Sequence, residues 1–116
     1  MLKDFRAYQI SNEFYQRCKS IRLPFHMKDQ LTRASASIAL NLAESSGKRT
    51  TKDRIRYFTM ALGSVRECEA ILQLEKIQDP VALDLLDQLG AILFTLSQIP
   101  KKGKTSHHCE DRTSDI

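Results

Sequence analysis

Apolar residues recur at steps of three and four through most of the chain, which is the pattern of amphipathic α-helices. The first stripe predicts a helix over residues 3–22 and consists of Ala7, Ile10, Phe14, Cys18 and Ile21. Pro24 lacks an amide hydrogen and disfavours helical angles at the residue before it. We therefore expect this helix to end before Leu23, with a short turn through Phe25 and His26.

The next periodic stretch is rich in small residues and predicts a helix over residues 27–46. Its inner face should consist of Leu31, Ala34, Ser35, Ile38, Asn41 and Leu42. Because residues 34–43 are mostly small, a neighbouring backbone could come unusually close. Gly47 follows and fits a left-handed C-terminal cap, where the absence of a Cβ removes the steric penalty.

A third helix is predicted over residues 51–76, with Thr50 or Thr51 as its N-cap. Its inner face should consist of Ile55, Phe58, Leu62, Val65, Ile71 and Leu72. Gly63 lies in the middle of this helix, where a glycine costs about 1 kcal/mol relative to alanine. We expect a compensating close contact, most simply with the small residues of the preceding helix.

Asp79-Pro80 marks the start of a fourth helix, because an acid suits the N-cap and proline suits the first helical position. This helix is predicted over residues 80–99, with Leu83, Leu86, Leu89, Ile92, Leu93, Leu96 and Ile99 inside. Four helices with short connections predict an all-α, antiparallel, up-and-down four-helix bundle over residues 1–100. Residues 101–116 have almost no apolar side chains, so we expect a disordered tail.

Composition supports one domain: a chain of 116 residues should remove roughly 65% of its unfolded surface from water. The formal net charge of +4 allows an anionic partner.

Cys18, Cys68 and Cys109 are far apart and have no C-x-x-C spacing, so we expect reduced thiols. The N-terminus lacks the apolar run of a signal peptide, and no run could span a bilayer, so the expected location is the cytoplasm, with no membrane partner.

Two central blocks carry a family resemblance. They read Gln30-Leu31-x-Arg33-Ala34-Ser35-x-Ser37-Ile38, Asn41-Leu42-Ala43-Glu44, Gly47-Lys48, then Arg56-x-Phe58 and Ala61-Leu62-Gly63-Ser64-Val65-x-Glu67. With the aromatic segment 5–15 and Leu23-Pro24, they resemble the bacterial family of 23S ribosomal RNA intervening-sequence proteins. The resemblance implies a small cytoplasmic bundle that assembles as a homo-oligomer, usually a pentamer, without established enzymatic activity. A more distant likeness is to the accessory variability determinant of diversity-generating retroelements, which implies a reverse transcriptase and nucleic acid as partners.

The predicted turn after residue 46 carries a basic cluster, opposed locally only by Asp53, that consists of Lys48, Arg49, Lys52, Arg54 and Arg56. Such clusters bind phosphates of RNA or DNA through charge and counterion release. The alternative is a solvated helix start that only keeps the protein soluble. Positive residues at a helix N-terminus oppose the helix dipole and so need another reason. In a ring every subunit would repeat the cluster, and avidity would strengthen a weak contact.

A second set of polar residues consists of Arg33, Asn41, Glu44 and Glu67. Asn41 on an inner stripe could fix register or oligomeric state, or could bond a neighbouring side chain. The three charged residues could form a buried or interfacial charge network, or could simply be exposed. A catalytic role for Glu44 or Glu67 would need a nucleophile or histidine beside it, and the helices supply none.

Sites for metals and cofactors are not indicated either. The chain has no Glu-x-x-His pair for a di-iron centre, and His107-His108-Cys109 alone cannot form a closed metal site. Phosphate loops, nucleophile elbows and dinucleotide fingerprints are missing from the sequence. We therefore expect no cofactor, no metal and no enzymatic activity.

The sequence thus predicts a homo-oligomeric interaction protein that presents basic turns to nucleic acid or to a nucleic-acid-associated protein. The alternative is a structural or adaptor oligomer that binds a protein partner without nucleic acid. A third hypothesis, an enzyme that uses Glu44 or Glu67, would require an activity that disappears in a folded glutamine variant.

Overall fold

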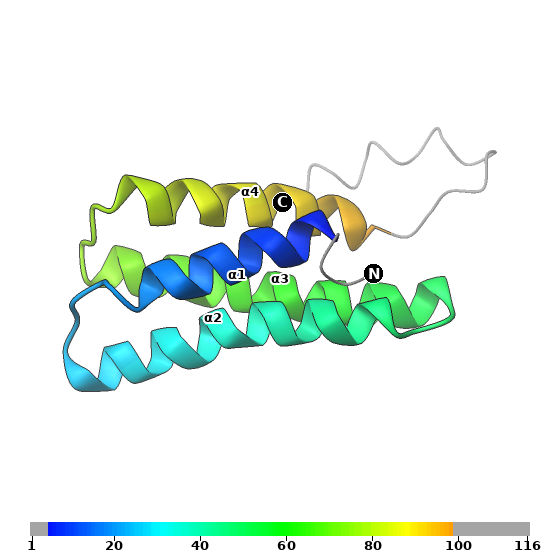
Figure 1. Ribbon diagram of the computed structural model, residues 1–116, viewed down its shortest axis with the longest axis horizontal. Coiled ribbons are helices and arrows are strands. Elements are labelled where there is room, and N and C mark those ends of the chain that lie inside the picture. The colour runs from blue at the N-terminus through cyan, green and yellow to red at the C-terminus, as the bar shows by residue number, and fades with distance from the viewer. Residues whose placement is uncertain (1–4, 99–116) are drawn as a thin grey trace.

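The computed structural model describes residues 5–98, which form four α-helices joined by short connections (Figure 1). Their bounds are α1 Arg6–Cys18, α2 Phe25–Ser46, α3 Thr51–Leu74 and α4 Pro80–Leu96. Consecutive helices pack on each other, and α4 closes the arrangement by packing on α1. The predicted all-α four-helix bundle is confirmed. The tail expected to be disordered, residues 101–116, lies outside the described residues.

One hydrophobic core runs through the bundle and contains most of the predicted inner positions. The largest fully buried side chains include Phe14, Leu31, Ile38, Leu42, Val65, Leu72, Leu86, Leu89 and Leu93. Leu83 is an exception, because 41% of it is exposed. The buried stripe of α4 starts at Ala82, and the next residue lies about 100° further round the helix, outside the core.

The connection between α1 and α2 differs from the prediction, since α1 ends at Cys18 and α2 begins at Phe25. The Lys28 ammonium of α2 donates hydrogen bonds to the carbonyl oxygens of Cys18 and Lys19, both at 3.0 Å, and to that of Ile21. These bonds satisfy carbonyls that a longer α1 would have paired internally. Pro24, with φ −56° and ψ 149°, is the N-cap of α2, so Phe25 and His26 are helical and not a turn.

The predicted left-handed cap at Gly47 is wrong, because Gly47 has φ −95° and ψ 0°. Its amide donates to the Glu44 carbonyl at 3.1 Å, which ends α2 in a tight right-handed turn that needs no glycine. The left-handed residue is instead Lys76, with φ 54°, at the end of α3. Lys76 donates to the Gln73 carbonyl at 3.1 Å and Ile77 to the Leu72 carbonyl at 2.9 Å, which is a Schellman motif.

The close contact expected at Gly63 is also wrong. Apart from the adjacent residues and the nearby backbone of α3, a Cβ built on Gly63 would meet no described atom within 4 Å, and the residue is exposed. Gly63 lies on the outer side of α3, because its neighbours Ala61 and Val65 at two-residue spacing are both fully buried. Its conformational cost is therefore not offset by any contact inside the bundle.

The predicted N-caps are confirmed at both positions. The Thr50 hydroxyl accepts a hydrogen bond from the Asp53 amide at 3.1 Å and starts α3. The Asp79 carboxylate accepts from the Ala82 amide at 3.1 Å and starts α4, with Pro80 at the first helical position. Among the described helices, none is long and apolar enough to cross a membrane.

Candidate nucleic-acid interface

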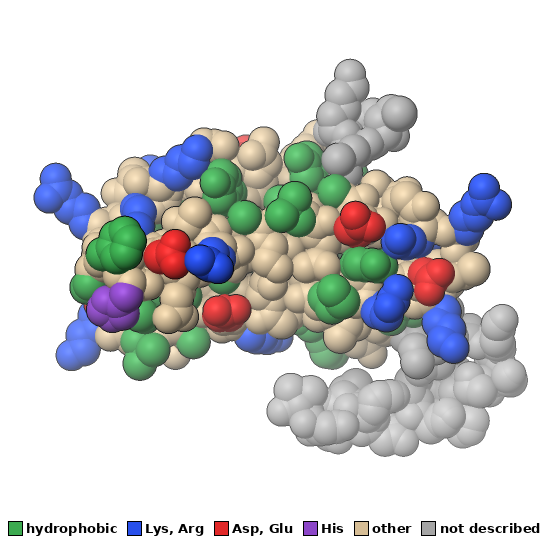
Figure 2. Space-filling view, turned by 90° about the horizontal axis from the view of Figure 1, so that it is seen from below, with side chains coloured by type: hydrophobic (Ala, Val, Ile, Leu, Met, Phe, Trp, Pro, Cys, Tyr) green, Lys and Arg blue, Asp and Glu red, His purple; other side chains and the backbone are tan. Residues whose placement is uncertain are grey.

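The five predicted basic residues lie together at one end of the bundle. Lys48 and Arg49 belong to the connection after α2, while Lys52, Arg54 and Arg56 lie in the first two turns of α3. Figure 2 shows Lys and Arg side chains at this end, where α2 passes into α3, and also at the opposite end. The Thr50 cap fixes where α3 begins, and so it fixes which side chains of α3 flank the turn.

Two of these cations hold the turn itself. Arg54 is half-buried and donates from Nη1 to the Lys48 carbonyl oxygen at 2.9 Å. The Lys48 ammonium lies 3.5 Å from Glu44 Oε1, one helical turn earlier. The Arg54 bond joins the connection to α3, and the Lys48–Glu44 contact joins it to α2. Arg54 therefore stabilises the backbone of the turn, which its position in the sequence did not indicate.

Tyr57 also belongs to the site, although the charge pattern of the sequence indicated only the cations. The Lys48 ammonium and the Arg56 guanidinium each lie 5.1 Å from the centre of its ring. Both distances are within the range of cation–π attraction. Tyr57 therefore orients two of the five cations, and the signal for this role is its position directly after Arg56. The adjacent Phe58 is buried in the core, as predicted.

Arg49 and Lys52 are the free cations of the cluster. Both are exposed, and neither makes a hydrogen bond, ion pair or ring contact with any residue in the described part of the chain. Arg56 is exposed as well, with Tyr57 as its ring partner. Three cations thus remain accessible on a turn whose backbone is fixed by the other two.

The second predicted set lies on the outer surface of α2 and α3. Arg33 is 78% exposed in its side chain and pairs with Asp29 at 3.1 Å, and Glu44 pairs with Lys48. Glu67 is exposed and makes no hydrogen bond or ion pair within residues 5–98. The charges are therefore at the surface of the chain and not buried in its core.

Asn41 is half-buried at the seam between α2 and α3 and does not lie in the centre of the inner stripe. Its amide donates to the Ser37 carbonyl at 3.0 Å and to the Ser37 hydroxyl at 3.1 Å. Ser37 in turn accepts from the Ser64 hydroxyl of α3 at 2.9 Å. This short polar chain fixes how α2 and α3 are aligned.

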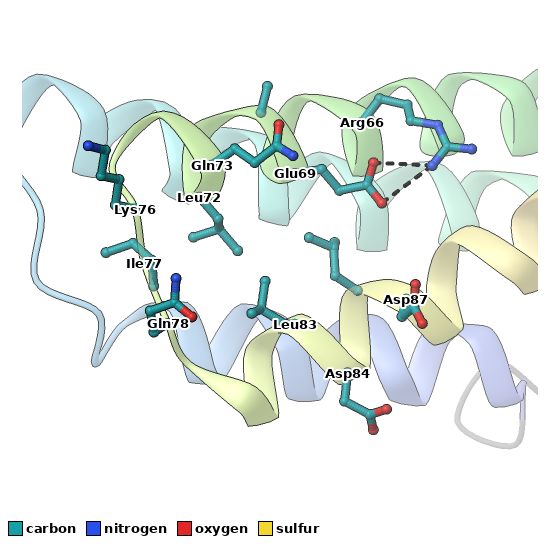
Figure 3. Close-up of a pocket in the computed structure, with 12 residues that line it drawn as sticks. Arg66, Glu69, Leu72, Gln73, Lys76, Ile77, Gln78, Leu83, Asp84 and Asp87 are labelled. Carbon is teal, nitrogen blue, oxygen red and sulfur yellow. Dashed lines mark hydrogen bonds and ion pairs between the residues drawn. The ribbon is translucent and has the colours of Figure 1, made fainter.

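A separate groove lies between α3 and α4 near their connection (Figure 3). It has a volume of about 900 Å³ and is open to solvent. Arg66 and Glu69 pair across one turn of α3 at 3.1 Å along its side, and Asp84 and Asp87 lie on the α4 side. Its lining contains no His, Cys or Ser. Within the described residues, no group of three His, Cys, Asp or Glu side chains could hold a metal ion.

Comparisons with known proteins give one result. A family model described as 23S rRNA-intervening sequence protein matches residues 3–99. No curated protein and no solved structure matches the chain. The match spans all four helices and includes the basic turn.

Proposed function

The chain belongs to the 23S rRNA-intervening sequence protein family, as its sequence motifs indicated, and from this premise we propose that it is a cytoplasmic, non-enzymatic homo-oligomer that binds nucleic acid. The contact surface is the basic turn between α2 and α3. The family description names 23S rRNA, which makes RNA the first nucleic acid to test. A nucleic-acid-associated protein such as a reverse transcriptase is a further candidate partner.

The observation that carries the proposal is the state of the cations on that turn. Arg49 and Lys52 are exposed and unpaired within the described chain, while Arg54 and Lys48 hold the backbone between them. Free cations on a fixed turn lose little side-chain pairing when they meet phosphates, and they release counterions from the nucleic acid. Among the described residues of this turn, no aromatic face is free for base stacking, because Tyr57 already contacts two cations. Binding should therefore depend on phosphates and not on base sequence.

Assembly is supported by the outer face of α2 and α3, defined by Leu40, Met60 and Gly63. Leu40 is 64% and Met60 46% exposed, and Gly63 leaves open space on the same face. Figure 2 shows apolar side chains on this face between its two charged ends. Exposed apolar side chains around a glycine suit close packing of a second copy, with Arg33, Glu44 and Glu67 at the rim. The pentamer implied by the family resemblance is the expected size.

Titration of a short mixed-sequence RNA, and of DNA of the same length, tests the nucleic-acid proposal. We expect affinity to fall steeply between 50 mM and 200 mM salt in a manner typical of phosphate contacts. The variant Arg49→Gln/Lys52→Gln should bind at least about tenfold more weakly, and its salt dependence should decrease by about 1.5 in log–log slope. The matched control is Arg6→Gln/Lys19→Gln. It removes two exposed cations, one at the first residue of α1 and one directly after its last residue.

Equal losses in the two double variants would mean that net charge, and not the turn, determines binding. Fluorescence anisotropy gives the affinities, and circular dichroism verifies that both variants fold.

A structural or adaptor oligomer that binds a protein without nucleic acid is the second candidate. It is favoured by Val81 and Phe94 of α4, which are 49% and 41% exposed on a helix that carries none of the basic cluster. The same titration decides between the two. An oligomer that binds neither RNA nor DNA at any salt concentration supports the adaptor.

A further inference from the structure

Phe25 is the most exposed of the large apolar side chains in the described chain, at 86%. It is the first residue of α2, directly after Pro24, whose ring restricts the backbone. One turn later, Lys28 is bonded to three carbonyl oxygens at the end of α1. The side chain is therefore uncovered, but the backbone that carries it is firmly attached to the bundle.

The α3–α4 groove offers the complementary shape. Its floor is apolar, with Leu72 and Leu86 almost fully buried beneath it and Ile77 packed against the core. Leu83 stands at its edge, 41% exposed, and Ala70 is the small residue on the α3 side. Figure 3 shows Leu72, Ile77 and Leu83 around the space between the two helices. Seven of the twelve lining residues are polar or charged, so the groove combines an apolar floor with a polar margin, and an apolar floor of this kind can receive a side chain.

The α4 side of the groove is acidic, and its α3 side carries Lys76 and the Arg66–Glu69 pair, whereas Phe25 lies near an exposed Arg22. Arg22 and His26 flank Phe25, are exposed, and make no hydrogen bond or ion pair with the described residues. On the α4 side of the groove, Asp87 is likewise without an ion pair in the described chain, and Asp84 accepts only the Gln88 amide, at 2.9 Å. Such complementary charges favour one orientation of two partners over others.

We propose that Phe25 of one copy inserts into the α3–α4 groove of the next copy, with Arg22 beside Asp84 and Asp87. This contact rests on the proposed homo-oligomer and identifies two of its surfaces. Because the two surfaces differ, a copy that places its Phe25 on one neighbour can still offer its own groove to another, and contacts repeated in this way are heterologous. Heterologous contacts close into a ring when the rotation between copies allows it. A buried aromatic side chain at the centre of such a contact is typical of a binding hot spot.

The test uses two variants of the full chain. Phe25→Ser removes the inserted side chain, and Ala70→Trp fills the groove. Each variant alone should sediment as a single chain of 13.3 kDa, with association weakened about thirtyfold or more. An equimolar mixture keeps one intact Phe25 and one intact groove, so it should form a dimer and nothing larger. Phe94→Ser, which removes another exposed aromatic side chain, is the matched control and should leave assembly unchanged.

Three outcomes would overturn the contact. An oligomeric wild type whose mass is unchanged in Phe25→Ser or Ala70→Trp would refute it while the proposed homo-oligomer stands. Monomeric variants that form no dimer when mixed would indicate a face-to-face contact and would also refute it. A monomeric wild type would refute both the homo-oligomer and this contact. RNA binding by the isolated chain would still be measurable in that case, because the basic turn lies at the other end of the bundle (Figure 1).

Discussion

Single residues connect distant parts of this small bundle, and Asp79 is the clearest case. Besides capping α4, its carboxylate accepts from Arg17 Nε at 3.0 and 3.1 Å, which joins the start of α4 to the end of α1. Desolvation raises the pKa of Asp79, but hydrogen bonds from the Ala82 amide and from Arg17 outweigh it. The resulting pKa lies below the ordinary value of 3.8.

This shift predicts an acid-dependent contribution to stability. Since the folded pKa is below the unfolded one, the carboxylate stabilises the fold fully above pH 3.8, and the contribution is lost as pH falls through the folded value. Asp79→Asn keeps an acceptor for the Ala82 amide but loses the charge. We expect the variant to lower the free energy of unfolding by about 0.5–1 kcal/mol at pH 7. In strong acid the wild-type carboxyl is protonated as well, so wild type and variant should be equally stable.

Urea unfolding of wild type and variant between pH 2.5 and 7 measures the difference. Asp84→Asn is the control, because that carboxylate on the same helix is exposed and bonded only to Gln88. A difference between wild type and Asp79→Asn that persists unchanged in acid would contradict the assignment.

Lys76 is the second informative residue, since a non-glycine side chain at φ 54° costs about 1–2 kcal/mol. Lys76→Gly removes this strain but increases the freedom of the unfolded chain, which offsets about half of the gain. We expect a net stabilisation of about 0.5–1 kcal/mol in urea unfolding. Lys76→Ala loses the same charge but keeps a Cβ, so its free energy of unfolding should not increase. Equal stability of the glycine and alanine variants would count against strain at this position.

At the scale of elements, Lys28 decides where α1 stops. A charged donor bonded to three backbone carbonyls replaces the last turn of a helix, and the bond to Ile21 also fixes the path toward Pro24. Lys28→Met keeps most of the aliphatic chain and removes the donor. Because hydrogen bonds to charged groups contribute about 1.5–3 kcal/mol, we expect a loss of about 2 kcal/mol in the free energy of unfolding.

Hydrogen exchange localises that effect. Amides in the last turn of α1 should exchange faster in Lys28→Met than in wild type, while those of α3 follow global stability alone. Lys19→Met removes a neighbouring exposed lysine and should change neither quantity appreciably. A loss confined to global unfolding would mean that Lys28 does not hold the end of α1 specifically.

Helix α3 contains the open position Gly63. Alanine there should raise the free energy of unfolding by about 1 kcal/mol, since within residues 5–98 no atom outside the surrounding α3 backbone and the two adjacent residues lies within 4 Å of the added methyl group. Gly63→Leu should also fold without loss, in contrast to the close packing that the sequence pattern suggested. Urea unfolding at low protein concentration measures both variants, and destabilisation by alanine would contradict the described packing. Sedimentation of the same variants reports separately whether a second copy uses the open space.

Local chemistry explains which elements could be predicted. Thr50 and Asp79 cap their helices through their own neighbours, so sequence suffices there. The end of α1 depends on Lys28 from another helix, which no local rule contains. Glycine adopts the left-handed conformation most easily, so the sequence predicts a left-handed cap at Gly47. It occurs at Lys76 because the chain must turn there while Ile77 packs against the core.

In the candidate site, too, local sequence predicts which residues lie together, whereas contacts between side chains decide which of them are accessible. Adjacency in sequence placed the five basic residues around one turn. Which of them are free depends on side-chain geometry, since Arg54 reaches back to the Lys48 carbonyl and Tyr57 lies near two cations. That geometry reduces the accessible set to Arg49, Lys52 and Arg56.

At the scale of the whole molecule, the bundle separates two surfaces. The basic turn lies where α2 meets α3, and the α1–α2 and α3–α4 connections lie at the opposite end (Figure 1). Phe25 begins α2 after the first of these connections, and the groove borders the second. Nucleic-acid binding and the Phe25 contact should therefore be separable by mutation. A ring built from contacts near one end would present all its basic turns at the other, where they could bind one nucleic-acid chain together.

Two thiols on different helices of the core can report how the bundle opens. Cys18 of α1 and Cys68 of α3 are buried and unpaired. Burial raises the pKa of Cys18 to about 12, and it raises the pKa of Cys68 well above its ordinary range. Because the thiolate is the reactive species, both groups should resist alkylation until the bundle opens.

In a Cys109→Ser background, iodoacetamide at pH 8 should modify Cys18 and Cys68 together, at a rate that rises with urea as the unfolded population does. Adding Ser20→Cys, at an exposed position, supplies an internal standard that should react at once. Mass spectrometry of digested samples gives the separate rates. Equal rates would show that α1 and α3 open in one cooperative step, whereas much faster modification of Cys18 would show that α1 detaches first. In the second case the contacts of Arg17 and Lys28 would not suffice to hold α1 on the bundle.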